Sequence, residues 1–155
     1  MRIILILFIH LKKYRIKFDI RKEFRHRRER TNKQLKRCNE IIEWSKKHVD
    51  KLKDHNLFAT GTTGGLIQQS SPELSITAMK SGPLGGDQQL GSMICEGNLD
   101  ILFFFTDPMT PQPHDVDIKA LLRLSTMYNC VVACNLATAD FVIESPLFDQ
   151  PQNHE

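Results

Sequence analysis

Two unbroken apolar runs set the pattern of this chain. Residues 3–9 read Ile-Ile-Leu-Ile-Leu-Phe-Ile, and residues 101–105 read Ile-Leu-Phe-Phe-Phe. Runs of this length without polar positions are typical of strands that helices cover on both faces, as in a parallel sheet. Shorter apolar segments at 57–59, 76–79 and 131–133 predict three further strands. We therefore expect a sheet of roughly five strands.

Helical periodicity separates these strands. From Asn39, apolar residues recur on one helix face and Glu and Lys on the other, which predicts an amphipathic helix ending near Asp54. Further helices are expected to open near Leu66, to run through residues 90–94, and to run from Ile118. Alternating strands and helices predict the α/β class, in a single doubly wound domain with a parallel sheet and helices on both faces.

A long basic stretch at residues 12–36 interrupts this alternation. The first 55 residues hold 18 of the 21 Lys and Arg side chains but only 7 of the 18 Asp and Glu side chains. Acidic residues are mixed among the basic ones and few aromatic residues accompany them, which favours a solvated helix or an inserted segment. Nucleic-acid binding stays open as a minor alternative.

Membrane-spanning segments, signal peptides and cysteine patterns are the sequence features that indicate the cellular compartment. The run at 3–9 is far shorter than the ~20 apolar residues of a membrane span. A signal peptide would need small residues at the cleavage site, where Lys12, Lys13 and Arg15 stand instead, so a buried strand is the better interpretation. The cysteines show no CxxC pair and no complete zinc spacing, which favours reduced thiols in the cytoplasm; they are Cys38, Cys95, Cys130 and Cys134.

Four polar clusters follow predicted strands, at residues 60–64, 81–87, 107–117 and 135–140. In open parallel sheets, ligands bind beyond the carboxyl ends of the strands, so all four clusters are expected to converge on one site. The first cluster reads Thr-Gly-Thr-Thr-Gly, and glycines, threonine hydroxyls and a helix N-terminus together suit a phosphate. No Lys follows, so it is not a Walker A loop. A glycine-rich turn that only caps a helix would look the same.

The chain resembles the methylglyoxal synthase family over about residues 39–148. The resemblance rests on strings in the family's order and spacing: Ala-Thr-Gly-Thr-Thr-Gly (59–64), Ser-Gly-Pro-Leu-Gly-Gly-Asp-Gln-Gln (81–89), Asp-Pro (107–108) with Pro-His-Asp (113–115) and Asp117, and Ala-Thr-Ala-Asp (137–140). Related regulatory and cyclohydrolase domains lack the full Gly-Gly-Asp-Gln-Gln and Pro-His-Asp set. The implied organisation is an atypical basic segment at 1–38 with a possible first strand at 3–9, a methylglyoxal synthase-like domain at 39–148, and a polar tail at 149–155.

The resemblance implies a lyase that eliminates phosphate from dihydroxyacetone phosphate through an enediolate to give methylglyoxal, a bypass of glycolysis. Asp87 would remove the carbon-bound proton, His114 would donate to the carbonyl oxygen, and Asp117 or Asp107 would orient the ring or pass protons. Six residues would hold the phosphate: Thr60, Gly61, Thr62, Thr63, Ser81 and Gly82. No metal or cofactor is implied. Whether phosphate leaves or stays, as in an isomerase, depends on the angle of its C–O bond to the enediolate plane, which a sequence does not display.

The resemblance also implies partners and a compartment. Dihydroxyacetone phosphate would be the substrate, inorganic phosphate the product and an expected inhibitor, and the assembly a cytoplasmic homohexamer, with no nucleic-acid or membrane partner. Two departures leave an alternative open. The family's first strand ends in Ala-His-Asp just before its first helix, whereas residues 32–37 stand there in this chain. Either an insertion separates the run at 3–9, followed by His10, from that helix, or the strand is missing.

The second departure is the C-terminus, where the family continues into a further strand and helix that supply an Arg near the site. Both departures support the alternative of a catalytically impaired module of the same fold that still binds phosphates or effectors.

Overall fold

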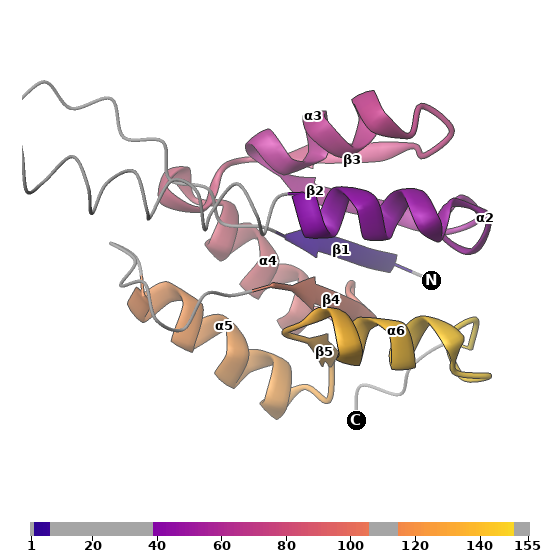
Figure 1. The fold of residues 1–155 in the computed structure, drawn as a ribbon. Helices are drawn as coiled ribbons and strands as arrows, with labels where there is room; N and C mark the ends of the chain where they lie inside the picture. The colour runs from indigo at the N-terminus through magenta and orange to yellow at the C-terminus, as the bar shows by residue number, and fades with distance from the viewer. Residues whose placement is uncertain (1, 7–38, 106–114, 151–155) are drawn as a thin grey trace, which may run out of the picture.

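One parallel sheet organises the molecule (Figure 1). The computed structural model describes residues 2–6, 39–105 and 115–150. Five strands lie in the order β3-β2-β1-β4-β5; they are β1 (Arg2–Ile6), β2 (Asn56–Thr60), β3 (Ile76–Met79), β4 (Ile101–Phe104) and β5 (Val131–Ala133). Every strand pair is parallel, which confirms the expected α/β class and sheet.

The central strand is β1. Ile4 pairs with Phe58 of β2 on one side and with Leu102 of β4 on the other. The alternative in which this strand is missing is therefore wrong, because the apolar run near the N-terminus supplies it. Residues 7–9 and His10 lie outside the described residues.

Helices cover both faces of the sheet (Figure 1). One face carries the helical residues 39–47 with, after a turn at His48, α2 (Val49–Leu52), and also α3 (Gly61–Ser70) and α6 (Leu136–Glu144). The other face carries α4 (Gly86–Cys95), preceded by the short 3-10 helix η1 (Gly82–Leu84), and α5 (Asp115–Met127). None of the helices in the described ranges is long and apolar enough to cross a membrane.

Strand β4 shows why its sequence is apolar at every position. Ile101 and Phe103 pack into the cluster beneath α3 and α6, whereas Leu102 and Phe104 pack into the cluster beneath α4 and α5. Successive side chains of a strand point to opposite faces, so burial on both faces requires a continuous apolar run. All four residues of β4 are buried.

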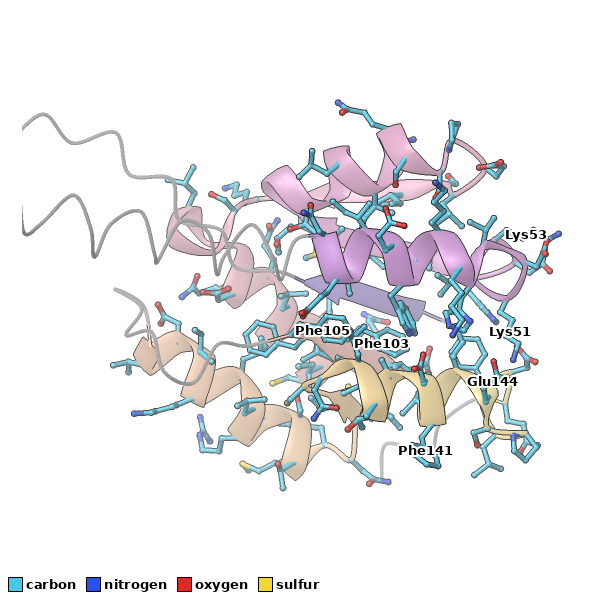
Figure 2. All side chains as sticks on the ribbon, viewed as in Figure 1. Lys51, Lys53, Phe103, Phe105, Phe141 and Glu144 are labelled. Carbon is cyan, nitrogen blue, oxygen red and sulfur yellow. The ribbon has the colours of Figure 1, made fainter. Side chains whose placement is uncertain are left out.

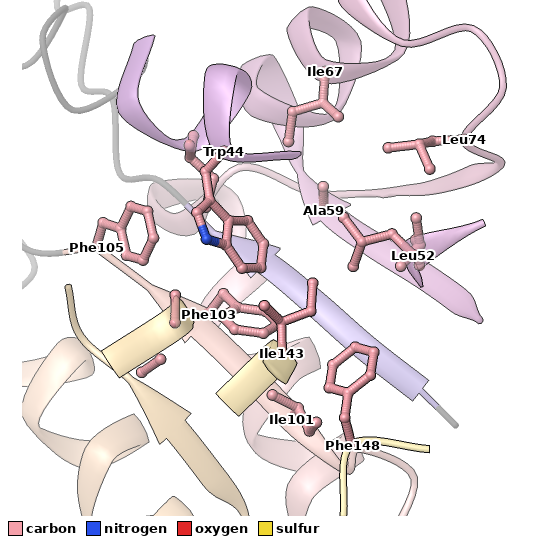
Figure 3. Close-up of a cluster of buried hydrophobic side chains, with 14 residues drawn as sticks. Trp44, Leu52, Ala59, Ile67, Leu74, Ile101, Phe103, Phe105, Ile143 and Phe148 are labelled. Atoms are coloured by element: carbon pink, nitrogen blue, oxygen red, sulfur yellow. The ribbon is translucent and has the colours of Figure 1, made fainter. Parts of the chain in front are cut away.

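Trp44 joins the first helix to α6 across the sheet face (Figure 3). Its ring lies 4.6 Å from that of Phe103, centroid to centroid, and its Nε1 donates to Oδ1 of Asp140 at 2.9 Å. His48 Nε2 lies 3.4 Å from the same oxygen. Beside them, Lys51 donates to Glu144 at 2.6 Å (Figure 2). Trp44 is buried, as expected of a core residue.

This seam gives structural partners to one of the predicted polar clusters, residues 135–140. Asp140 lies within α6 and is engaged by Trp44 and His48, and Asn135 serves as the N-cap of α6, accepting from the Thr138 amide at 2.9 Å. These two residues therefore cap α6 and anchor it on the α2 side of the sheet. That this cluster joins the other three at one site stays a prediction.

Three helices begin earlier than their apolar periodicity predicts. Helix α3 starts at Gly61, directly after Thr60 of β2, and α4 starts at Gly86, before its first apolar residue. Helix α5 likewise begins at Asp115. The polar residues expected in loops thus form first helical turns, whose leading N–H groups have no partner within the helix.

The turn before α4 depends on a glycine. A Cβ at Gly86 would lie 2.2 Å from the Lys80 carbonyl oxygen, whereas one at Gly65 on α3 would meet nothing within 4 Å. We expect Gly86→Ala to lower the free energy of unfolding by about 1–3 kcal/mol or more, since backbone must move. Gly65→Ala, the matched control, should be neutral or stabilise by up to about 1 kcal/mol through helix propensity. Urea unfolding followed by circular dichroism measures both, and equal stability of the two variants would contradict this close contact.

Candidate active site

The connections that follow β2 and β3 meet at the carboxyl edge of the sheet. Gly61 has a φ of +35°, and a Cβ built on it would lie 3.2 Å from Cβ of Ser81. Thr60 pairs with Met79 in the β2–β3 register, so both strands end at the same level. The structure therefore brings Thr60 and Gly61 beside Ser81, as the sequence predicts for a shared phosphate site.

The N-terminus of α3 faces this edge. Thr60, in an extended conformation (φ −77°, ψ 136°), is the N-cap, and its side chain makes no capping hydrogen bond. Thr60 and Thr63 are both buried. An α-helix N-terminus offers unpaired N–H groups and the positive end of its dipole, which together favour an anion. The side chain of Thr62 lies outside the described part.

A tight turn then delivers the first turn of α4. The Ser81 carbonyl accepts from the amides of Leu84 at 2.9 Å and Gly86 at 3.0 Å. Gly85 has a φ of +98°, a left-handed conformation that glycine adopts without strain. Gly82 is buried in this turn. The chain thereby reverses within a few residues and places Asp87 at the start of α4.

Asp87 is a buried carboxylate at the start of α4. The residue is 4% exposed, and within the described residues neither Oδ1 nor Oδ2 has a hydrogen-bond partner. Burial, and to a smaller extent the charge of Asp117, raise the pKa of Asp87 to about 6. A carboxylate with a pKa close to neutrality is suited to take and return protons near physiological pH.

Asp117 reaches the same place from α5. It lies in the first turn of that helix, and Nε2 of Gln88 donates to its Oδ1 at 3.4 Å. Asp87, Gln88 and Asp117 line one groove of about 280 Å³ between α4 and α5. The rest of its lining is Gly91, Ser92, Ala120, Leu121 and Leu124.

Sequence analysis missed Gln88 and this groove. The spacing of residues along α4 could have indicated the groove. Gly91 follows Asp87 by four residues, so the two lie on the same face of a helix that begins at Gly86. Of the other predicted catalytic residues, Asp107 and His114 lie outside the described residues. In the part of the chain that the structure describes, no three His, Cys, Asp or Glu side chains form a group that could hold a metal ion.

Comparison with known proteins shows which family this chain resembles. A family model described as the MGS-like domain matches residues 40–134. The methylglyoxal synthase of Oleidesulfovibrio alaskensis is 61% identical over 110 residues, which cover 71% of this chain and 75% of that protein. The methylglyoxal synthase of Photorhabdus laumondii is 59% identical over 110 residues, covering 71% and 72%.

A solved structure agrees with these sequence relatives. The crystal structure of methylglyoxal synthase from Elizabethkingia anophelis superposes with a TM-score of 0.67 at 50% sequence identity, covering 72% of this chain and 73% of that one. With a matching family model over more than half of its residues and relatives at this level of identity, the chain belongs to the methylglyoxal synthase family.

Proposed function

We propose that the site at the carboxyl edge of the sheet eliminates phosphate from dihydroxyacetone phosphate to give methylglyoxal, with Asp87 as the general base. The observation that carries this proposal is the burial of the Asp87 carboxylate, unpartnered among the described residues, next to a helix N-terminus suited to a phosphate. Substrate would complete the interactions that the free site lacks.

The reaction needs one base and a fixed phosphate. Asp87 takes a proton from the hydroxymethyl carbon next to the carbonyl, which leaves an enediolate. The hydroxyl group on that carbon then loses its proton and becomes the aldehyde, the C=C electron pair of the enediolate shifts to the bond next to the phosphate-bearing carbon, and phosphate leaves with the electron pair of its C–O bond. The enol that remains takes a proton on its methylene carbon and becomes methylglyoxal. No oxidant or reductant is consumed.

The phosphate would rest on the first turn of α3. Backbone N–H groups of Gly61, Thr62 and Thr63, with Thr60, supply donors on one side. Ser81 and Gly82, which the structure brings against Gly61, supply the other side. Inorganic phosphate would occupy the same donors and compete with substrate. By fixing the phosphate, this cradle also sets the angle of its C–O bond and favours elimination over isomerisation.

Asp117, His114 and Asp107 would handle the charge that develops on the carbonyl oxygen. His114 and Asp107 belong to the segment between β4 and α5, and α5 begins immediately after His114. A His that donates to the oxygen would stabilise the enediolate, with Asp107 or Asp117 orienting the ring. The proposal assigns them these roles from their order in the chain.

Asp87→Asn should abolish most of the activity. Loss of a general base costs about 10²–10⁴ in rate, which an assay of methylglyoxal and phosphate release would measure. The variant should stay folded and be more stable than wild type above pH 6, because the raised pKa of Asp87 means that ionisation destabilises the native state. Exposed Asp50→Asn is the control. An unchanged rate in Asp87→Asn would show that Asp87 is not the general base. If the wild-type chain binds phosphate but does not turn over substrate, it is instead a catalytically impaired binding module.

The pH profile should carry the signature of the same group. Asp87 must be ionised to accept a proton, so kcat/KM should rise with pH through an acid limb near 6, the pKa that burial and Asp117 give it. Below that limb the base is protonated and activity falls tenfold for each pH unit. Steady-state rates between pH 4.5 and 8 measure the limb. A limb near 4, the ordinary range of an aspartate, would show that the buried carboxyl is not the base.

We also propose a homo-oligomer, the hexamer of the family. Large exposed apolar side chains among the described residues support it, since association could remove them from water; they are Leu84, Val116, Met127, Phe141 and Leu147. Phe141 is 83% exposed on α6 (Figure 2). Sedimentation velocity at micromolar concentration should therefore show a species several times heavier than 17.9 kDa. A monomer with full activity would contradict the assembly.

A further inference from the structure

Gln88 stands between two carboxylates that are assigned to the reaction. It follows Asp87 directly on the first turn of α4, and its Nε2 donates to Oδ1 of Asp117 on the first turn of α5 at 3.4 Å. All three side chains line the groove between these helices. We propose that Gln88 is a positioning residue, whose amide holds Asp117 beside Asp87 so that the charge of Asp117 acts on the base. This inference rests on the proposed function.

The helix geometry explains why a side chain is needed here. Asp87 and Asp117 come from different helices, and two carboxylates of like charge repel each other. Within the described residues Asp87 offers no hydrogen bond to hold Asp117, because a carboxylate accepts and does not donate. The amide of Gln88 does donate, and a hydrogen bond to an ionised carboxylate favours its charged form. Gln88 thus holds the Asp117 side chain near α4.

The length of this contact fits a site without substrate. At 3.4 Å it lies beyond the usual 2.7–3.2 Å of an N–H···O bond. Catalytic hydrogen bonds are often long in free enzymes and shorten when the substrate binds. Gln88 is exposed and Asp117 is half-buried, so both side chains can move by the small distance required.

The electrostatic consequence reaches the base. Burial is the main cause of the raised pKa of Asp87, and Asp117 is the second. In the described part, Asp117 on α5 is the charged group that acts on Asp87, and Gln88 lines the same groove. None of the described residues that line this groove carries a positive charge. Lys80, which precedes the turn, is exposed and its backbone N–H donates to Gln89. Moving Asp117 therefore changes the pKa of Asp87.

Two substitutions of similar size separate this role from a merely structural one. Gln88→Met removes the donor, releases Asp117 toward solvent and should lower the pKa of Asp87 by about half a unit. Gln88→Glu removes the same donor but adds a negative charge, and should raise that pKa by a similar amount. Loss of packing alone would not lower the pKa of Asp87 in Gln88→Met, whereas the charge added in Gln88→Glu raises that pKa in either case and so calibrates the size of the shift. Exposed Gln69→Glu on α3 is the control for an added charge.

The acid limb of kcat/KM measures these shifts in the active enzyme. Gln88→Met should also lower kcat about three- to tenfold, the loss expected for one typical intramolecular hydrogen bond, with KM within twofold because the phosphate is held elsewhere. Rates and limbs equal to wild type in both variants would overturn the inference. So would shifts in the same direction.

A second measurement does not need turnover. Carboxyl carbon NMR of aspartate-labelled protein, with the Asp87 signal identified from Asp87→Asn, follows the titration of that group directly. Opposite shifts in Gln88→Met and Gln88→Glu support the positioning role, and identical titrations overturn it. An inactive wild-type chain would sink the proposed function alone, whereas an active wild type with unshifted Asp87 in both variants would sink only the role of Gln88.

Discussion

The approach of Gly86 to the carbonyl of Lys80 is the contact on which the site depends. It lets the chain turn back after β3 within a few residues, so α4 starts at the level where the strands end. Asp87 is then enclosed by the turn, the end of β2 and the neighbouring α5 instead of facing solvent. A side chain at Gly86 would push the helix away and open the carboxylate to water. The burial of Asp87 therefore depends first on the path of the backbone at Gly86 and only then on the neighbouring side chains.

Enclosing a carboxylate in this way costs stability, and the fold accepts that cost where chemistry occurs. An ionised group loses hydration on burial, and its pKa rises until ionisation and protonation are balanced near neutral pH. Repulsion from the charge of Asp117 destabilises the ionised form of Asp87 further. Asp140, by contrast, is a partly exposed carboxylate that accepts a hydrogen bond from Trp44. A buried carboxylate that has no hydrogen-bond partner among the described residues is typical of a functional site, because selection for stability alone would replace it.

The sequence predicted the architecture well because continuous apolar runs have few structural solutions. The runs at 3–9 and 101–105 predicted two strands, and β1 and β4 lie side by side in the sheet; β5 matches its predicted residues 131–133. Helix starts were predicted too late, since Gly61 and Gly86 carry no apolar periodicity. The structural partners of the cluster at 135–140 were not predicted, because which partner Asp140 meets depends on a helix 96 residues away. Gln88 was quoted within a motif, yet its partner Asp117 becomes visible only when α4 and α5 are packed together.

The position of β1 has a consequence for how the chain folds. Ile3 pairs with Leu57 and with Ile101, so the strand made first must wait for partners that are synthesised much later. Contacts this distant in sequence close large loops, and folding slows as they come to dominate the structure. Until β2 and β4 emerge, the most apolar strand of the sheet has no neighbour to cover it. Exposed apolar strands of this kind associate with one another, so synthesis is the stage at which this protein is most open to aggregation and to capture by chaperones.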